Sequence, residues 1–155
     1  MKEWHIYVDG ASLGNPGFAG AGMIAFDEDG HEMWRDSIHL GLMTNNMAEY
    51  EALVRALRKV GDPAGRPINV YTDSQLVAYQ ILGKYRIKNE GLKPYLKEAL
   101  RLMRTLPHVA IKYIPREGNK LADKLAKDAA AKRGRRMVAG HDPEESPGIE
   151  GQDGL

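Results

Sequence analysis

Four acidic residues with distinctive neighbours are the side chains in this sequence best suited to chemistry. They are Asp9 in Tyr7-Val8-Asp9-Gly10, Glu49 after Thr44-Asn45-Asn46, Asp73 in Thr72-Asp73-Ser74, and Asp123 in Asn119-Lys120-Leu121-Ala122-Asp123. Each lies near the end of an apolar segment, where a fold can gather side chains from distant parts of the sequence. Carboxylates that converge in a confined site need positive charge beside them, and Mg²⁺ binds through hard oxygen ligands. The pattern therefore indicates metal-dependent phosphoryl chemistry.

The first 40 residues are expected to form three strands. Trp4, Ile6 and Val8 alternate with polar or amphipathic residues, which is the period of a strand. A Gly/Asn/Pro turn over 10–17 precedes a second apolar run at 19–26. The sequence Asp27-Glu28-Asp29-Gly30 favours a hairpin turn into a third strand at 32–40. These features predict an antiparallel meander.

The apolar period changes to that of a helix at Thr44. We expect Thr44 or Asn45 to cap this helix and Gly61 to end it. Glu49 falls on the apolar stripe of the helix and should face the sheet, with Leu53, Ala56, Leu57 and Val60. The remaining chain predicts a strand at 67–72, helices at 74–82 and 88–106, a strand at 109–114 and a last helix at 118–132. This order indicates an α/β fold with a five-stranded mixed sheet.

Length and composition are those of a single domain. A chain of 155 residues can bury one core, and it has no cysteine, so disulfides, thiolate metal sites and a cysteine nucleophile are excluded. The sequence from Met1 has no apolar stretch long enough for a signal peptide or membrane span. We expect a cytoplasmic protein, with a monomer as the default.

The formal net charge of +1 conceals an uneven distribution. Five of the 21 acids lie in residues 141–155, which contain no Lys or Arg, so residues 1–140 carry 22 basic and 16 acidic side chains. That moderately basic body suits a polyanion without requiring one. From Gly134 the apolar period is lost, and we expect a catalytic domain at 1–133 and a disordered Gly/Pro/acidic tail at 134–155.

Each acid also has an ordinary structural interpretation. Asp9-Gly10 is typical of a turn, and Asp73 of a helix cap. Glu49 could complement a helix dipole, and Asp123 could pair with Lys127 one turn along. Ligands in open α/β sheets collect at the carboxyl ends of strands where the strand order reverses. One strand layout would bring all four acids there, which independent structural roles do not predict.

In these segments the chain resembles type 1 ribonuclease H, the enzymes that cut the RNA strand of RNA–DNA hybrids. The resemblance covers about residues 3–132 and rests on Asp9-Gly10-Ala11-Ser12, Thr44-Asn45-Asn46 through Glu49, Thr72-Asp73-Ser74-Gln75, and Asn119 through Asp123. It implies the ribonuclease H-like fold, with three antiparallel strands followed by two parallel ones.

The resemblance also implies a mechanism. Asp9, Glu49, Asp73 and Asp123 would hold two Mg²⁺ ions, roughly 3.5–4 Å apart, astride the scissile phosphate, with Mn²⁺ as a substitute. Asp9 would bridge both ions, and the products would carry a 5′ phosphate and a 3′ hydroxyl. Asn15, Asn45, Asn46 and Gln75 match positions on the minor-groove side, where the 2′-hydroxyl distinguishes RNA from DNA. Thr44 and Asn89 match a pocket for a DNA-strand phosphate, although turn and cap roles remain open for these residues.

Two segments depart from the family pattern. The loop before the last acid, 114–119, lacks the His that many members carry, and we expect Arg116 to substitute in part. Many members also insert a basic, Trp-rich protrusion where this chain has only 83–88, and no hybrid-binding module precedes Trp4. A short form of this kind should bind the hybrid weakly, with a shallow salt dependence, and rely on six cations near its end: Lys124, Lys127, Lys132, Arg133, Arg135 and Arg136. Cleavage of double-stranded RNA stays open.

Other interpretations remain at this point. Integrases, junction resolvases and proofreading exonucleases share a similar sheet, and fold alone does not separate them. The Asn-Asn-x-x-Glu element and the Asp-Ser-Gln after the fourth strand favour the ribonuclease. A nucleic-acid-binding module with a vestigial site is disfavoured because all four acids are present, and a protein–protein adaptor is disfavoured further.

Overall fold

The fold is built on a five-stranded mixed sheet with the strand order β3-β2-β1-β4-β5. A computed structural model describes residues 2–139 of the chain, with side chains through residue 132. The strands are β1 (Trp4–Ser12), β2 (Gly17–Phe26), β3 (Glu32–Met43), β4 (Ile68–Thr72) and β5 (Val109–Tyr113). β1, β2 and β3 pair antiparallel, whereas β4 pairs parallel with both β1 and β5. The predicted fold class, a five-stranded mixed sheet with three antiparallel strands followed by two parallel ones, is confirmed.

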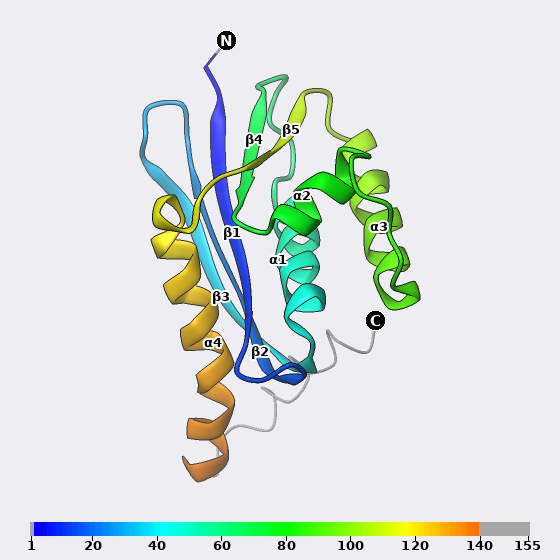
Figure 1. Cartoon of the computed structure of the whole chain (residues 1–155). Coiled ribbons are helices and arrows are strands. Elements are labelled where there is room, and N and C mark those ends of the chain that lie inside the picture. The colour runs from blue at the N-terminus through cyan, green and yellow to red at the C-terminus, as the bar shows by residue number, and fades with distance from the viewer. Residues whose placement is uncertain (1, 140–155) are drawn as a thin grey trace.

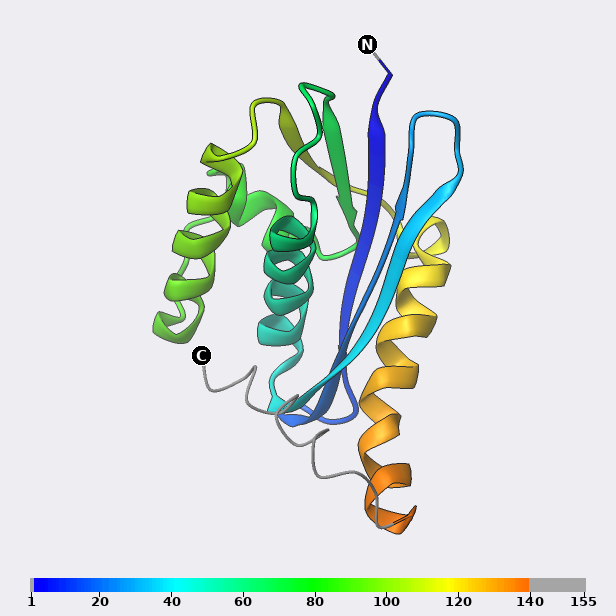
Figure 2. The ribbon, with the colours of Figure 1, turned by 180° about the vertical axis from the view of Figure 1, so that it is seen from behind.

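Helices cover both faces of this sheet (Figures 1 and 2). One face carries α1 (Asn45–Lys59), α2 (Gln75–Ile81) and α3 (Lys93–Arg104), the last preceded by the short helix η1 (Glu90–Leu92). The other face carries α4 (Lys120–Ala139), which follows the short helix η2 (Arg116–Gly118). α4 packs on β1, β2 and β3. Buried apolar residues lie on both sides of the sheet, with Tyr50, Ile6, Met23 and Leu53 among the largest.

Glycines in two strands allow helices to approach the sheet closely. A Cβ on Gly10 of β1 would lie 2.2 Å from the backbone carbon of Ala48 in α1. On β2, a Cβ on Gly20 or Gly22 would lie 2.3 Å from a backbone oxygen of α4, that of Ala126 or Ala122 respectively. Glycine is required at all three positions because any side chain would push a helix away.

Two predicted boundaries differ from the structure. The helical segment expected at 88–106 is divided into η1 and α3, since Asn89 caps the first turn and Pro94 lies in the first turn of the second helix. The last helix continues through Gly134 to Ala139, beyond its expected end at residue 132. The low helix propensity of Gly134 does not outweigh the high propensity of the Ala, Lys and Arg residues around it. The division into a catalytic domain at 1–133 and a tail at 134–155 stays a prediction. Residues 140–155 of the expected tail lie outside the described residues.

None of the helices in the described part of the chain is both long enough and apolar enough to cross a membrane.

Candidate active site

Three of the four predicted acids converge at one edge of the sheet. Asp9, Glu49 and Asp73 each offer a carboxylate oxygen, and these oxygens all lie within 4.8 Å of one another. Asp9 and Glu49 are buried, with 4% and 8% of their surface exposed, and Asp73 is half-buried. Such a donor set of hard oxygens suits a divalent cation.

The end of β4 creates the space in which these carboxylates meet. β1 and β4 pair as far as Val8 and Thr72. Beyond this point β1 continues, whereas the segment after β4 turns away into α2. Asp73 is the first residue past this point, and the helix is capped by Ser74, whose hydroxyl accepts from the Val77 N–H at 3.2 Å. The structural alternative of Asp73 as a cap is therefore wrong. Asp9 likewise lies inside β1 and not in a turn.

Glu49 reaches the site from α1 on the opposite side of β1 from α4. Its position on the apolar stripe orients the side chain toward the sheet, as predicted. The backbone N–H of Gly10 donates to Glu49 Oε1 at 2.9 Å. Thr44 caps α1 by accepting from the Met47 N–H at 3.2 Å, and it fixes the turn from which Glu49 projects.

Asp123 combines its ordinary role with proximity to the site. Its Oδ2 pairs with Lys127 Nζ at 3.1 Å, as expected for residues one helical turn apart. The Asp123 carboxyl group also contributes to raising the pKa of Asp9. The fourth acid therefore borders the cluster from the first turn of α4.

Asn119 links three parts of the site and was not among the predicted functional residues. Its Nδ2 donates to the Val8 carbonyl at 2.8 Å and lies 3.3 Å from Asp73 Oδ2. Its backbone carbonyl accepts from the Asp123 N–H at 3.0 Å. Asn119 is 1% exposed, and its Oδ1 has no hydrogen-bond partner among the described residues. The sequence signal was present, since an amide at the start of a helix carrying a predicted ligand is well placed to orient it.

The crowding of carboxylates changes their protonation. Burial, followed by the charges of Glu49 and Asp73, raises the pKa of Asp9 to about 10. Burial also raises the pKa of Glu49 to about 8, although the Gly10 N–H and the Arg116 charge oppose this shift. The cluster therefore holds protons at neutral pH unless a cation replaces them. A divalent ion would supply the positive charge that this cluster requires, and the buried Asn119 Oδ1 has an acceptor site to spare beside it.

Arg116 lies on η2, in the loop where many related sequences carry a His. It is exposed, and its charge lowers the pKa of Glu49. Arg116 therefore acts electrostatically on the carboxylate cluster, and its role as a partial substitute for the His stays a prediction.

The predicted substrate-contact residues fall into three pairs. Asn15 and Asn45 are brought together, because Asn15 Oδ1 accepts from the Asn45 N–H at 3.0 Å. Asn46 and Gln75 are exposed at the starts of α1 and α2. Thr44 and Asn89 both serve as helix caps, Asn89 Oδ1 accepting from the Gly91 N–H at 2.8 Å. The structure shows no direct contact between Thr44 and Asn89, so their shared phosphate pocket stays a prediction.

A basic groove at the start of α1 was not predicted. A cavity of about 470 Å³ lies between α1, α2 and the connection to η1, lined by Lys84, Arg86, Lys88, Asn46, Gln80 and Asn89. Its three cations form no ion pair with another described residue. The sequence signal was the alternate spacing of these cations in the connection at 83–88, where the basic protrusion is absent. Of the cations predicted instead, Lys124 and Lys127 pair with Asp128 and Asp123, and the side chains of Arg133, Arg135 and Arg136 lie outside the described residues.

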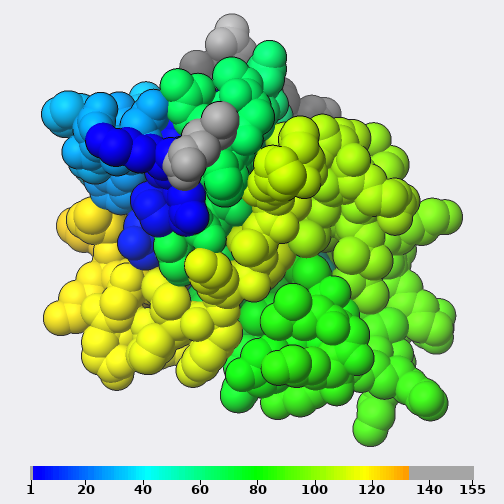
Figure 3. Space-filling view, turned by 90° about the horizontal axis from the view of Figure 1, so that it is seen from above, coloured from blue at the N-terminus to red at the C-terminus, as the bar shows by residue number. Residues whose placement is uncertain are grey.

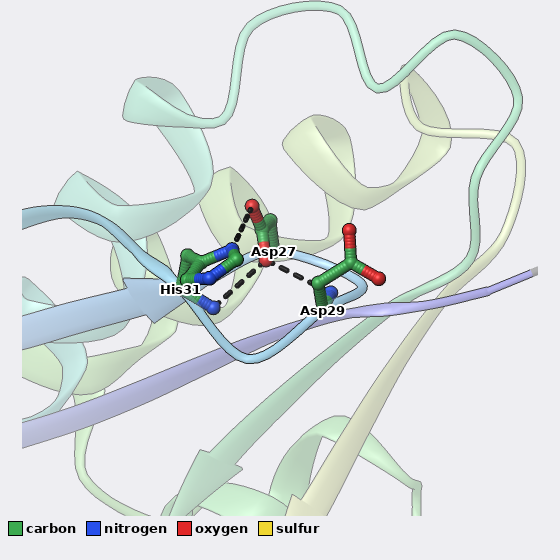
Figure 4. A group of neighbouring side chains, drawn as sticks. All are labelled: Asp27, Asp29 and His31. Carbon is green, nitrogen blue, oxygen red and sulfur yellow. Dashed lines mark hydrogen bonds and ion pairs between the residues drawn. The ribbon is translucent and has the colours of Figure 1, made fainter.

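A second acidic group lies at the turn between β2 and β3 and has a structural role (Figure 4). Asp27 Oδ1 accepts from the backbone N–H groups of Asp29 and His31, both at 2.9 Å. These bonds, chiefly that of His31, hold the pKa of Asp27 below its ordinary value. The exposed group closes the predicted hairpin and has no feature that indicates a ligand.

Comparison with known proteins agrees with this site. The sequence profile of a family described as "reverse transcriptase-like" matches residues 7–129. LC11-RNase H1, isolated from compost by a metagenomic approach, has a solved structure that is 38% identical, covers 86% of this chain and 99% of its own, and superposes with a TM-score of 0.80. The chain belongs to the type 1 ribonuclease H family.

Two curated relatives extend the comparison. Ribonuclease HI of Halobacterium salinarum is 37% identical over 81% of this chain, which spans 63% of that relative's length. The putative hydrolase EbsB of Enterococcus faecalis is 34% identical over 82% of this chain and 93% of its own. A structure of LC11-RNase H1 in complex with an RNA/DNA hybrid is 36% identical over 84% of this chain and 98% of its own, with a TM-score of 0.77.

Proposed function

We propose that this ribonuclease H hydrolyses the RNA strand of RNA–DNA hybrids at the cluster of Asp9, Glu49, Asp73 and Asp123. The observation that carries this proposal is the convergence of three buried or half-buried carboxylates, with oxygens within 4.8 Å of one another. A relative of similar length has been solved with an RNA/DNA hybrid bound. The products would carry 5′ phosphate and 3′ hydroxyl ends.

The carboxylates of Asp9, Glu49, Asp73 and Asp123 would hold divalent metal, two ions of Mg²⁺ or Mn²⁺. Bound metal would supply the charge that activates water and stabilises the departing 3′ oxygen. The chain's own contribution is to keep its ligands in place. The Gly10 N–H orients Glu49, and Asn119 orients Asp73. Arg116 would place a further cation near the cleaved phosphate.

Recognition of the hybrid would divide between the two sides of this site. The amides of Asn15, Asn45, Asn46 and Gln75 can donate to and accept from 2′-hydroxyls, which only the RNA strand carries. The basic groove would receive the phosphate backbone of the DNA strand, with Asn89 and the Thr44 end of α1 beside it. In this chain Lys84, Arg86 and Lys88 would replace the larger basic protrusion of other members. Fewer phosphate contacts imply weaker binding with a shallow salt dependence.

The test is cleavage of end-labelled RNA–DNA hybrid, double-stranded RNA, duplex DNA and single strands, each with Mg²⁺, Mn²⁺ or EDTA. Wild type should cut the RNA of the hybrid only with metal, and Asp9→Asn should abolish cutting while leaving the fold intact by circular dichroism. The double-stranded RNA lane determines strand selectivity. If no RNA-containing substrate is cut with either metal, the proposal fails and the cluster would be a retained scaffold.

A further inference from the structure

A second cavity lies on the α4 face of the sheet, outside the carboxylate cluster. It has a volume of about 430 Å³, which falls in the range of small-ligand sites, roughly 300–1,000 Å³. His5 and Tyr7 of β1 and Phe26 of β2 line one side, and Asn119 to Ala122 line the other. Figure 3 looks onto this end of the molecule, where the start of β1 (dark blue) lies between the β2–β3 turn (lighter blue) and the segment around the start of α4 (yellow).

The aromatic rings of this wall, those of His5, Tyr7 and Phe26, contact one another or the ring of Tyr71 in β4, which does not itself line the cavity. Tyr7 and Tyr71 stack with centroids 4.7 Å apart and an interplanar angle of 21°. His5 stacks on Tyr71 at 5.8 Å, and its Nδ1 lies 2.8 Å from the Tyr71 hydroxyl. Phe26 meets Tyr7 edge-on, with centroids 6.0 Å apart. These rings are only half-buried, since α4 packs on β1, β2 and β3 without comparable contact to β4 among the described residues. They present a preformed apolar surface on which a planar ring can pack.

The rim offers polar groups of both kinds. Glu117 supplies an exposed acceptor and Lys120 an exposed donor, and neither forms an ion pair with another described residue. A nucleobase has a matching character, with apolar faces and an edge that carries both donors and acceptors. Aromatic side chains combined with a nearby cation are also how proteins commonly bind unpaired bases. An aliphatic ligand would leave this rim unused.

The cavity shares its elements with the carboxylate cluster. Tyr7 precedes Asp9 by two residues on the same face of β1, because alternate residues of a strand point the same way. Leu121 and Ala122 directly precede Asp123 on α4. A nucleic acid held at the carboxylates would therefore bring unpaired bases near this wall.

We propose that the aromatic cavity binds an unpaired nucleobase, of a free nucleotide or of single-stranded RNA that extends from the hybrid. The placement of the RNA rests on the proposed function, whereas binding of a free nucleotide does not. The segment that forms the wall also carries Asn119, so occupation of the cavity would couple to the position of Asp73.

The test begins with adenosine 5′-monophosphate in EDTA, followed by ¹H–¹⁵N NMR of the full chain. We expect saturable shifts centred on Tyr7, Phe26, Gly30 and Leu121, with a dissociation constant on the order of 1 mM, because stacking of a single base is weak. Leu121→Trp should fill the cavity and weaken binding at least tenfold. Leu82→Trp is the matched control, because both leucines are 51% exposed and Leu82 lies outside the cavity. The wild-type shift map does not depend on either variant folding.

Several results would overturn the proposal. These are no saturation up to about 10 mM, shifts centred elsewhere, equal affinity in Leu121→Trp, or indole binding as tightly as the nucleotide. A second arm compares blunt and single-strand-extended hybrids in the Asp9→Asn background. A gain of threefold or more from the extension, lost with Leu121→Trp, would assign the cavity to the substrate strand, and nucleotide binding without such a gain would assign it to free nucleotides. Binding without cleavage would defeat only the proposed function, and cleavage without nucleotide binding only the present inference.

Discussion

The backbone N–H of Gly10 donates to Glu49 Oε1 at 2.9 Å, across an approach of strand and helix that leaves no room for a side chain. The hydrogen bond and the close contact depend on each other, because a Cβ at Gly10 would collide with Ala48 and Glu49 of α1. A glycine beside a candidate metal ligand thus sets the distance at which that ligand reaches the cluster.

Gly10→Ala is expected to destabilise the protein by roughly 1–3 kcal/mol, the usual cost of overpacking, and to reduce cleavage by at least tenfold. The displaced α1 would carry Glu49 out of reach. Ala11→Gly is the control, since it exchanges the same two residue types one position along β1 and costs about 0.5–1 kcal/mol through backbone entropy alone. Thermal unfolding and hybrid cleavage should be measured for both. Wild-type cleavage in a folded Gly10→Ala protein would disprove this role.

Asp9→Asn is expected to raise stability in EDTA at pH 8 by roughly 1–3 kcal/mol. The pKa of Asp9 is raised from its ordinary 3.8 to about 10, and that of Glu49 from 4.5 to about 8. The folded state therefore binds more protons than the unfolded chain between about pH 4 and pH 8–10, and stability falls as pH rises through that window. The gain from Asp9→Asn should accordingly disappear near pH 4. Urea unfolding at several pH values measures this, with exposed Asp29→Asn as the control; a gain independent of pH would contradict the electrostatic explanation.

Asn119→Ala is expected to raise the Mg²⁺ concentration for half-maximal cleavage by about 10–100-fold, as is usual when a group that orients a metal ligand is removed. The variant loses the bonds to Val8 and Asp73 but keeps all four acids. Asn119→Asp would add a negative charge to the crowded cluster, so the metal-free variant should be less stable than the metal-free wild type. A purely structural role would lower stability while leaving the metal dependence unchanged, so titration with Mg²⁺ decides between the two.

Replacing Lys84, Arg86 and Lys88 together by Ala is expected to flatten the salt dependence of hybrid binding by about two to three units of log–log slope, near 0.9 per phosphate contact. The wild-type slope itself should be shallow, below about six. The control removes three exposed cations of α3, Lys93, Lys97 and Arg104, which do not line the groove. Binding is best followed by fluorescence anisotropy between about 50 and 200 mM salt. The titrations should use the Asp9→Asn background in Ca²⁺, so that the hybrid is not cleaved. Equal slopes for both triple variants would show that the groove does not contact the backbone.

The sequence predicts helices and strands well where the apolar period extends over many residues. It predicts poorly the contacts between residues that are distant in the sequence. The apolar stripe of α1 was sufficient to orient Glu49 toward the sheet, and the strand alternation placed Asp9 on β1. The role of Asn119 was missed because its partners, Val8 and Asp73, are distant in the sequence. The groove cations were missed for a related reason, since Asn46 and Gln80 complete the cavity from other elements. Asp123 shows both interpretations at once, as a partner of Lys127 and a neighbour of Asp9.

The glycines of β2 do more than admit α4 closely. Gly20 lies against the α4 backbone at Ala126 and Ala130, and Gly22 lies against it at Ala122 and Ala126. Two glycines of β2 therefore contact successive turns of one helix. Such a fit fixes how far the helix can slide along the sheet, in steps of one turn, about 5.4 Å. A slip of one turn would exchange Asp123 for Lys127 beside Asp9. The sign of the charge at that edge of the cluster is therefore determined by two residues that have no side chain.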